Sequence, residues 1–375
     1  MKKLLLLATL AATAVATAAT EAELGALAGR IAAYKSTHPR ARDRDIAAGL
    51  GISEAEFNLV AAGAVRLRDG QATAVAILMR EHELGEVTAL TRNAGVVLEV
   101  TATADKPIPG KDGGKSPAET AGLYVGPIDL RARLSAWAYA FAVSLPGKKA
   151  GETYRSFRFF DKHGVAIHKI IVGEAGADAF DKLVAELREP DPRRAMPIAP
   201  AEPETPAKPD TAVDVAALTA GWDKLTDAHQ FGRLVKNAGA TREQALRLAG
   251  KTRAESLDLK SIRLLFDGIA AKRVEVLAFV SNDGLTQIYT GGFVKTAAAG
   301  EWYNVLDPKL NIHLLEKDIA AVWIVRKPVA KGGTLTDVEF FDAAGHLVIQ
   351  FYGKRPRGGE EPAAWRELVE SLPRR

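Results

Sequence analysis

A proline-rich segment near the middle of the chain limits most strongly what this sequence can fold into. Residues 188–213 contain seven prolines with charged residues between them. Because proline has no backbone N–H and a fixed φ, this composition favours an extended linker over a helix or a sheet strand. In a chain of 375 residues, long enough for about two domains, the linker separates an N-terminal half, residues 21–187, from a C-terminal half, residues 214–375.

The two halves repeat the same order of segments. The matching pairs are 86–95 with 275–284, 129–131 with 311–313, and 159–164 with 340–345. In the first pair an apolar strand runs into a turn that contains Asn, and in the third it meets a turn with Asp and Gly before a second strand begins. These patterns predict antiparallel hairpins in both halves and indicate that one domain was duplicated.

Helical patterns precede and follow the strands in each half. They cover residues 31–36, 45–49, 54–62 and 179–187 in the first half, and 215–225, 229–237, 242–249 and 363–372 in the second. Helices, then several antiparallel strands, then a helix predict an α+β fold. We therefore expect a tandem structural repeat in which each half has helices and a large antiparallel sheet.

The first 20 residues are predicted to be a signal peptide. Lys2 and Lys3 precede an apolar run over residues 4–10, and Ala16-Thr17-Ala18 fits an A-x-A cleavage site. The alternative is an alanine-rich first helix. The stretch is too short and too rich in Ala and Thr for stable membrane insertion. A periplasmic location is the expectation that follows.

The composition excludes several kinds of site. The chain has no cysteine, so disulfides, thiolate catalysis and cysteine-based metal centres are ruled out. Metal chemistry must use His, Met, Tyr or carboxylates, and there are only seven histidines and three methionines. The formal charge is +4, and no Lys/Arg run is interleaved with aromatic residues. A nucleic-acid partner is therefore not expected.

His229 is the best candidate for a metal ligand. Thr226 or Asp227 can cap a helix that runs to Asn237, which places the histidine in the first turn. The partial positive charge of a helix N-terminus disfavours imidazolium, and a metal needs the neutral ring. The alternative is a capping or surface histidine, because His229 has no second ligand at metal-site spacing. A single protein ligand suffices if the metal brings four nitrogens of its own, which points to a porphyrin.

Several polar residues of the second half are candidates to hold the carboxylates of such a ligand. Arg242 follows Thr241 at a predicted helix start, and Lys327 follows an apolar strand. The last strand closes with Gln350, Tyr352 and Arg355. Arginine binds a carboxylate through two parallel hydrogen bonds, so these residues can hold propionates. Taken singly, each can equally be a solvated residue at a strand end.

The chain resembles the bacterial haem-trafficking and hemin-degrading family of the HemS/ChuS type over nearly all of its length after the predicted signal. The most specific motifs are Thr226-Asp227-Ala228-His229-Gln230-Phe231, Asp129-Leu130-Arg131, Gly85-Glu86-Val87 with Thr91-Arg92-Asn93, Trp323 to Pro328, and Gln350 to Arg355. The resemblance implies haem (iron protoporphyrin IX) held in a cleft between the two halves. It also implies a cytoplasmic protein, which is the alternative to the periplasmic location.

The resemblance implies roles for particular residues. His229 would be the axial iron ligand, and Arg131 would lie over the opposite face of the haem, where it is also the candidate catalytic residue. Arg242 and Lys327 would contact the propionates, with Gln350, Tyr352 and Arg355 at the same polar end. Phe279 would pack on the macrocycle, although its apolar strand makes core packing an equal interpretation.

Three functions follow from these residues. The first is binding and delivery of haem in a haem-uptake or iron-acquisition system, with a haem transporter or a downstream haem oxygenase as partner. The alternative is a haem-degrading enzyme of the haem-oxygenase kind; without a Gly-rich dinucleotide loop it would need an external reductant. The third and weakest is a repeat-built interaction protein that has lost its ligand.

Overall fold

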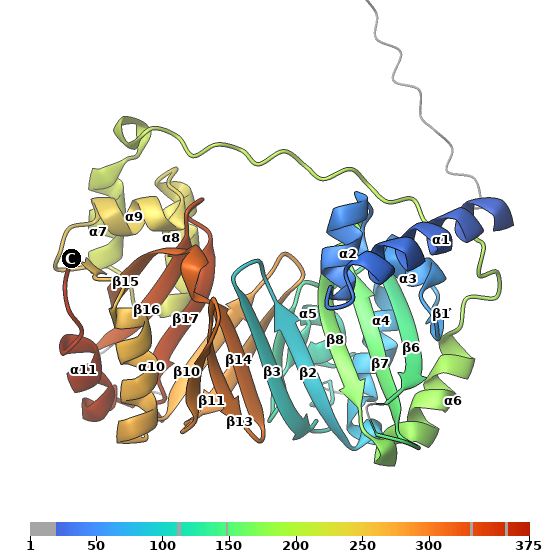
Figure 1. Cartoon of the computed structure of the whole chain (residues 1–375). Helices are drawn as coiled ribbons and strands as arrows, with labels where there is room; N and C mark the ends of the chain where they lie inside the picture. Colours follow the sequence, from blue (N-terminus) through green and yellow to red (C-terminus); the bar gives the residue numbers. More distant parts are fainter. Residues whose placement is uncertain (1–19, 111–113, 148, 331–332, 357–358) are drawn as a thin grey trace, which may run out of the picture.

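The protein has an α+β fold with two large antiparallel sheets side by side and helices packed around them (Figure 1). The computed structural model describes residues 20–110, 114–147, 149–330, 333–356 and 359–375. The expected fold class is confirmed. The predicted signal peptide lies outside the described residues, except for Thr20.

The N-terminal half supplies the first elements of both sheets. Its helices are α1 (Glu21–Thr37), α2 (Asp43–Leu50), α3 (Glu54–Val60), α4 (Gln71–Met79), α5 (Pro117–Ala121) and α6 (Ala177–Leu187), with a short 3-10 helix, η1 (Glu81–Leu84). Its strands are β1 (Ala64–Arg66), β2 (Glu86–Arg92), β3 (Val96–Thr103), β4 (Leu123–Tyr124), β5 (Asp129–Ala132), β6 (Tyr139–Pro146), β7 (Thr153–Phe160) and β8 (Ala166–Val172).

The C-terminal half follows the same plan. Its helices are α7 (Val215–Asp223), the 3-10 helix η6 (Ala228–Gln230), α8 (Phe231–Asn237), α9 (Arg242–Leu248), α10 (Ser261–Lys272) and α11 (Ala363–Glu370). Its strands are β9 (Ala254–Leu257), β10 (Val276–Ser281), β11 (Leu285–Gly291), β12 (Thr296–Ala299), β13 (Trp302–Asp307), β14 (Leu310–Leu315), β15 (Ile319–Pro328), β16 (Thr334–Asp342) and β17 (Leu347–Gly353).

Helix α1 begins ten residues earlier than the sequence pattern predicts. Thr20 and Glu23 form a capping box, in which the backbone N–H of Glu23 donates to Thr20 Oγ1 at 3.2 Å and that of Thr20 donates to Glu23 Oε2 at 2.8 Å. This reciprocal pair satisfies two backbone donors that the first turn of a helix otherwise leaves free. The N-terminal cap, not the apolar pattern, sets the start of α1.

Each sheet contains strands from both halves, whereas the sequence analysis expected each half to keep its own sheet. The nine-stranded sheet has the order β1-β6-β7-β8-β2-β3-β14-β13-β12, and the eight-stranded sheet has the order β4-β5-β11-β10-β17-β16-β15-β9. Strand β14 pairs with β3, and β5 pairs with β11. The halves therefore exchange their matching strands. Alternation of apolar residues sets which face of a strand is buried, but it does not name the neighbour.

Two asparagines join the halves where the sheets meet. Asn93 closes its own turn with Oδ1, which accepts from the backbone N–H of Gly95 at 3.0 Å, while its Nδ2 donates to the carbonyl of Ser281 at 3.1 Å. Asn282, its counterpart in the second half, closes the matching turn and donates to the carbonyl of Arg92 at 3.0 Å. Each asparagine thus stabilises one hairpin and attaches it to the other half.

The cores also cross between the halves. Phe266 of α10 packs in one cluster with buried residues of β10 and with Leu98 of β3. In the other half, Leu78 of α4 shares a cluster with Leu130 of β5 and Leu285 of β11. Burial of these apolar side chains stabilises the exchanged arrangement. Neither α4 nor α10 was predicted from the sequence.

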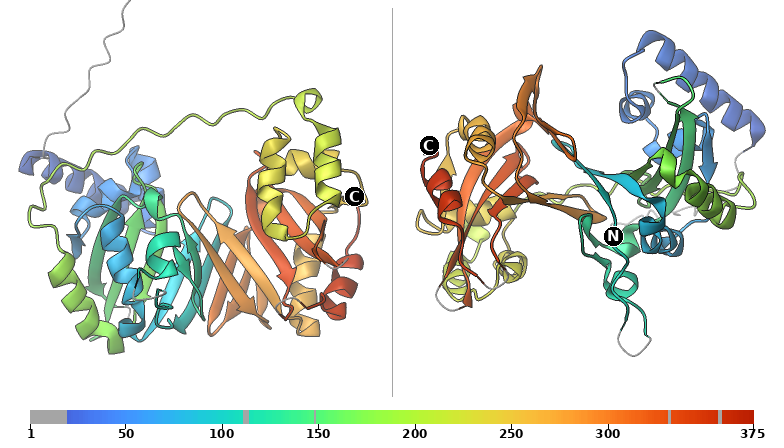
Figure 2. Two further views of the ribbon diagram at one scale, coloured as in Figure 1. Left: turned by 180° about the vertical axis from the view of Figure 1, so that it is seen from behind. Right: turned by 90° about the horizontal axis from the view of Figure 1, so that it is seen from below.

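The proline-rich segment runs from one half to the other and contains no helix or strand over residues 189–209 (Figure 2). Its first part is packed on the N-terminal half. Tyr139 donates a hydrogen bond to the carbonyl of Pro197 at 2.6 Å, and Met196 and Ile198 contact the apolar cluster around Phe141. The linker therefore does contribute side chains to a core, which its composition did not suggest. In the described parts of the chain, no helix combines the length and hydropathy needed to cross a bilayer.

His168 makes the stability of the fold depend on pH. It is buried in β8, with Nδ1 2.9 Å from Thr91 Oγ1, and burial lowers its pKa to about 3 from 6.5. Between these pH values the unfolded chain binds a proton that the folded protein does not, so stability is lost as pH falls below 6.5. We expect His168→Gln to flatten the fall in unfolding free energy between pH 6.5 and 4.5 by up to about 1.4 kcal/mol per pH unit.

Urea unfolding at a series of pH values measures this slope. His38→Gln is the matched control, because His38 is exposed at the end of α1. Parallel pH profiles for wild type and His168→Gln would contradict the assignment.

Candidate functional site

Strand register places four of the candidate residues on one face of the eight-stranded sheet. Strand β11 pairs with β5 on one side and with β10 on the other, and this pairing places Arg131 of β5 level with Ser281 of β10. Their side chains therefore lie on the same face of the sheet. Phe279 precedes Ser281 by two residues and therefore points to the same face. Phe279 is opposite Gln350 of β17, and Tyr352 comes two residues later. The exchanged strand β5 thus brings Arg131 from the first half onto a face built by the second.

The two faces of this sheet differ in exposure. Along β10, Val276, Ala278 and Val280 are buried against the apolar cluster that includes α10 and α11. Phe279 and Ser281, which alternate with them, are half-buried. The face that carries the candidate residues therefore remains partly open over β10, where an aromatic side chain is accessible.

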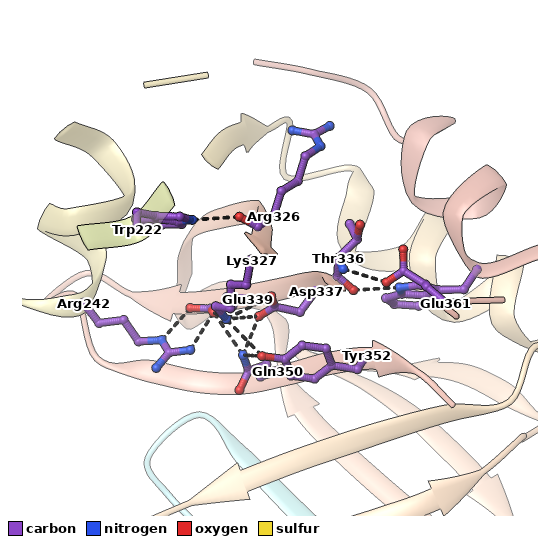
Figure 3. A network of polar contacts seen from close by, with 11 residues as sticks. Trp222, Arg242, Arg326, Lys327, Thr336, Asp337, Glu339, Gln350, Tyr352 and Glu361 are labelled. Carbon is purple, nitrogen blue, oxygen red and sulfur yellow. Dashed lines mark hydrogen bonds and ion pairs between the residues drawn. The ribbon is translucent and has the colours of Figure 1, made fainter. Parts of the chain in front are cut away.

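A buried ionic network lies at one side of this face (Figure 3). Lys327 Nζ of β15 is 2.8 Å from Asp337 Oδ2, 2.9 Å from Glu339 Oε1 and 3.0 Å from the Tyr352 hydroxyl. Arg242 at the start of α9 donates two hydrogen bonds of 2.6 Å to the carboxylate of Glu339. The side chains of Lys327, Asp337 and Glu339 are almost completely inaccessible to solvent. Two cations therefore face two acidic side chains, and of the four only Arg242, at 28%, is partly exposed.

The pKa values in the network follow from burial and from these charges. Burial alone would raise the pKa of Glu339, but the charges of Arg242 and Lys327 outweigh it and hold the pKa below its ordinary value. Burial alone would lower the pKa of Lys327, yet the neighbouring carboxylates raise it. For Asp337, burial raises the pKa more than Lys327 lowers it. Arg242, whose pKa the carboxylate of Glu339 raises, Lys327 and Glu339 are consequently the most firmly ionised members.

Asp337 and Glu339 are functional candidates that the sequence analysis missed. They alternate in β16 with Val338 and Phe340, which are buried in the apolar cluster on the other face. Two acidic residues two positions apart in a strand share a face. That alternation was visible in the sequence, but it did not reveal that the acidic face is buried against Lys327.

Phe231 connects the network to the turn that carries His229. Its ring centroid lies 4.6 Å from Lys327 Nζ and 5.0 Å from the Arg242 guanidinium carbon. Trp222 of α7 packs edge-on against the same ring at 4.7 Å and donates to the carbonyl of Arg326 at 2.8 Å. Cations over an aromatic face hold the ring in one orientation. The start of α8 is therefore fixed against β15.

His229 lies two residues before Phe231, in η6. The sequence predicted it in the first turn of an α-helix; the structure has a 3-10 turn there, and α8 starts at Phe231. Asp227 Oδ1 accepts from the backbone N–H of His229 at 2.8 Å and is 2.6 Å from Nδ1. These two hydrogen bonds lower the pKa of Asp227, and the charge of Arg355 adds to the effect. The imidazole is 95% exposed.

This geometry suits His229 to ligate a metal through Nε2. A carboxylate bound at Nδ1 fixes the tautomer and the orientation of a ligating histidine and increases its basicity. Asp227 occupies that position, so Nε2 is the nitrogen that remains available. The exposed ring has space around it for a large ligand.

The structure brings together only some of the predicted residues. Arg242, Lys327, Gln350 and Tyr352 meet in the network, and the Phe279 ring is 5.6 Å from that of Tyr352. Arg355 lies outside it and donates to the carbonyl of Gly359 at 3.0 Å.

Arg131 stands apart from this cluster. In β5, next to the short edge strand β4, it pairs with Asp129 and donates to the carbonyl of Tyr124 at 3.2 Å. Its side chain is 40% exposed. Asp337 and Glu339 already pair with the charges of Arg242 and Lys327. The binding of propionates by Arg242 and Lys327 therefore stays a prediction.

Comparison with known proteins gives concordant results for the two halves. The haemin-degrading HemS.ChuX domain matches residues 239–372, and the haem utilisation ChuX/HutX family matches residues 66–183. The hemin transport protein HmuS of Yersinia pestis is 36% identical over 90% of this chain and 94% of its own.

Solved structures resemble the chain over nearly its full length. Holo-PhuS, a heme-binding protein from Pseudomonas aeruginosa, has a TM-score of 0.85 and 36% identity, and the match covers 94% of this chain and 99% of PhuS. The heme degrading enzyme ChuS of Escherichia coli O157:H7 has a TM-score of 0.80 and 27% identity, covering 93% and 99%.

Proposed function

Because the chain belongs to the bacterial HemS/ChuS family, we propose that it binds haem and transfers it within a haem-uptake and iron-acquisition system. The observation that carries this proposal is the 36% identity to a hemin transport protein over 90% of the chain. The exposed imidazole of His229, oriented by Asp227, agrees with it because haem iron needs one or two axial donors from the protein.

We propose that His229 supplies the axial nitrogen through Nε2. Phe279 would provide an apolar contact for the macrocycle, because it is half-buried on the open face of the sheet. Arg131 would act at the same face as a hydrogen-bond donor, since its guanidinium is partly exposed. The buried network then has a positioning role: Lys327 and Arg242 hold Phe231, and through it the His229 turn.

Titration of the protein with hemin, followed at the Soret band, tests the proposal. We expect a saturable shift at one haem per chain. Absence of a saturable shift would overturn it and favour an interaction protein without this ligand.

Haem degradation is the second candidate function, favoured by the 27% identity and the TM-score of 0.80 with a heme degrading enzyme. Haem would then be the substrate, and an external reductant would supply electrons. The titrated protein is given ascorbate in air with catalase present. A Soret band that persists supports the carrier, whereas its decay with a ring-opened product supports the enzyme.

We also propose that the protein acts in the periplasm, with a haem transporter or a haem oxygenase as the partner that receives the haem. The support is the Lys-Lys start, the apolar run and the Ala16-Thr17-Ala18 site. The alternative is the cytoplasm. N-terminal sequencing of the protein from a periplasmic extract distinguishes them, because an exported protein would begin near Thr20.

A further inference from the structure

Three basic side chains lie together on one face of the nine-stranded sheet, in the N-terminal half. Strand pairing places Lys169 of β8 directly opposite Arg158 of β7 on one side and Leu90 of β2 on the other. Arg92 follows Leu90 by two residues in β2 and therefore shares its face. Neighbouring strands thus bring three cations to the same part of the sheet.

Two carboxylates from the helices over this face pair with two of the cations. Asp43 of α2 is 2.9 Å from Arg158, and Glu54 of α3 pairs with Arg92. Among the described residues, Lys169 has neither an ion pair nor a hydrogen bond through its ammonium group, although the charges of both carboxylates reach it. The cluster therefore has one positive charge more than it has negative charges.

The unpaired charge of Lys169 is unfavourable in this position. Its side chain is half-buried. Burial and the charges of Arg158 and Arg92 lower its pKa to about 8, and Asp43 and Glu54 only partly offset them. The amine is still mostly protonated at neutral pH, and like charges directly opposite in an antiparallel pair are destabilising. An anion beside Lys169 would remove this cost.

Hydrogen-bond donors for such an anion are present around Lys169. Arg92 donates only through Nη2, to Glu54, and Arg158 donates through Nε and Nη1. In the described part of the chain, Nε and Nη1 of Arg92 and Nη2 of Arg158 have no partner. Together with the ammonium group they can donate to several oxygens of one ion, which fits an oxyanion.

The excess of positive charge is confined to the first half of the repeat. The matching segments 159–164 and 340–345 align Arg158 and Lys169 with Glu339 and Gln350, which are also directly opposite each other. In the second half, two cations meet two acidic side chains. The two faces are therefore equivalent in the fold but differ in the ligand that their charges favour.

The proposed iron ligand has no counterpart on this face. Capping boxes at Ser53 and Thr241 align the start of α3 with the start of α9. Ala41 precedes Ser53 by the same number of residues as His229 precedes Thr241. A small anion therefore suits this face better than a second haem.

We propose that Lys169, Arg158 and Arg92 form a binding site for a small oxyanion of the phosphate type on the nine-stranded sheet. Lys169 supplies the charge that the protein leaves unpaired, and the two guanidinium groups supply further donors. The site is separate from haem binding and does not depend on it.

Calorimetric titration of the full-length protein with inorganic phosphate at neutral pH tests the proposal, with sodium chloride keeping the ionic strength constant. We expect saturable binding at one site. Lys169→Gln removes the charge and introduces the residue type of the matching position, Gln350, so it should weaken binding roughly tenfold or more. Lys169→Arg keeps the charge and should bind within a few-fold of wild type. Phosphate should also raise the Tm of wild type more than that of Lys169→Gln.

Lys182→Gln is the matched control, because Lys182 is exposed on α6, which packs against the opposite face of the sheet. It should bind phosphate as wild type does, and circular dichroism of each variant checks the fold. No saturable phosphate binding by wild type, or equal binding by wild type and Lys169→Gln, would overturn the proposal. An equal loss in Lys169→Arg would also overturn it, because charge would then not be the cause.

Discussion

His229→Ala is expected to weaken hemin binding by roughly tenfold to a hundredfold or more, since loss of even an outer partner of a metal ligand costs about that much. The physical reason is the loss of the exposed imidazole that η6 presents to solvent. The Soret maximum of any residual complex should also shift, because a different axial ligand changes the electronic spectrum of haem. Optical titration measures both effects in one experiment.

Two further variants separate ligation from general effects of the substitution. Asp227→Asn keeps the imidazole but removes the charge 2.6 Å from Nδ1, so it should weaken binding less than His229→Ala does. His346→Ala is the matched control: His346 is also exposed, with Nδ1 3.2 Å from Asp342 Oδ2, but it lies in the β16–β17 turn. Wild-type affinity and spectrum for His229→Ala would rule out this residue as the ligand.

Lys327→Met is expected to lower the free energy of unfolding by about 3–5 kcal/mol, the usual cost of breaking a buried ion pair from one side. Methionine fills the space of the lysine stem, but Asp337 then has no cation within hydrogen-bond distance. Glu339 keeps Arg242, so the damage should centre on Asp337. Urea or thermal unfolding followed by circular dichroism measures the loss.

A second substitution tests whether charge is the cause. In the double variant that combines Lys327→Met with Asp337→Asn, one cation again faces one carboxylate. This double variant should recover at least half of the lost stability. Lys354→Met is the surface control; Lys354 pairs with Glu275 at 2.9 Å but is 41% exposed, and its loss should cost less than about 1 kcal/mol. If Lys327→Met unfolds like the surface control, the network does not stabilise the fold.

Local elements were the part of this fold that the sequence predicted best. The capping box at Thr241 and Gln244 is present, with backbone-to-side-chain distances of 3.1 and 3.3 Å, and α9 begins at Arg242. The hairpin turns at Asn93 and Asn282 are present as well. Caps and turns are decided by hydrogen bonds between residues two to four positions apart, so a single stretch of sequence contains all the participants.

In the candidate site, too, the sequence predicted contacts between neighbours in the chain but not contacts between distant residues. His229 and the Asp227 that orients it are neighbours in the chain, so the turn that presents the imidazole could be read from the sequence. The pairing of Arg242 with Glu339 could not, because 97 residues separate them. The sequence therefore offered Arg242 and Lys327 as free cations, while the fold had placed Asp337 and Glu339 beside them.

By itself, the sequence determined the α+β class, the turns at Asn93 and Asn282, the cap at Thr241 and the closeness of Asp227 to His229. Only the tertiary structure decided that β5 pairs with β11 and β14 with β3, which carries Arg131 onto the face that Phe279 occupies. The physical reason is that period-two alternation tells which side of a strand is buried, whereas the choice of neighbour depends on how all the apolar faces can be buried at once.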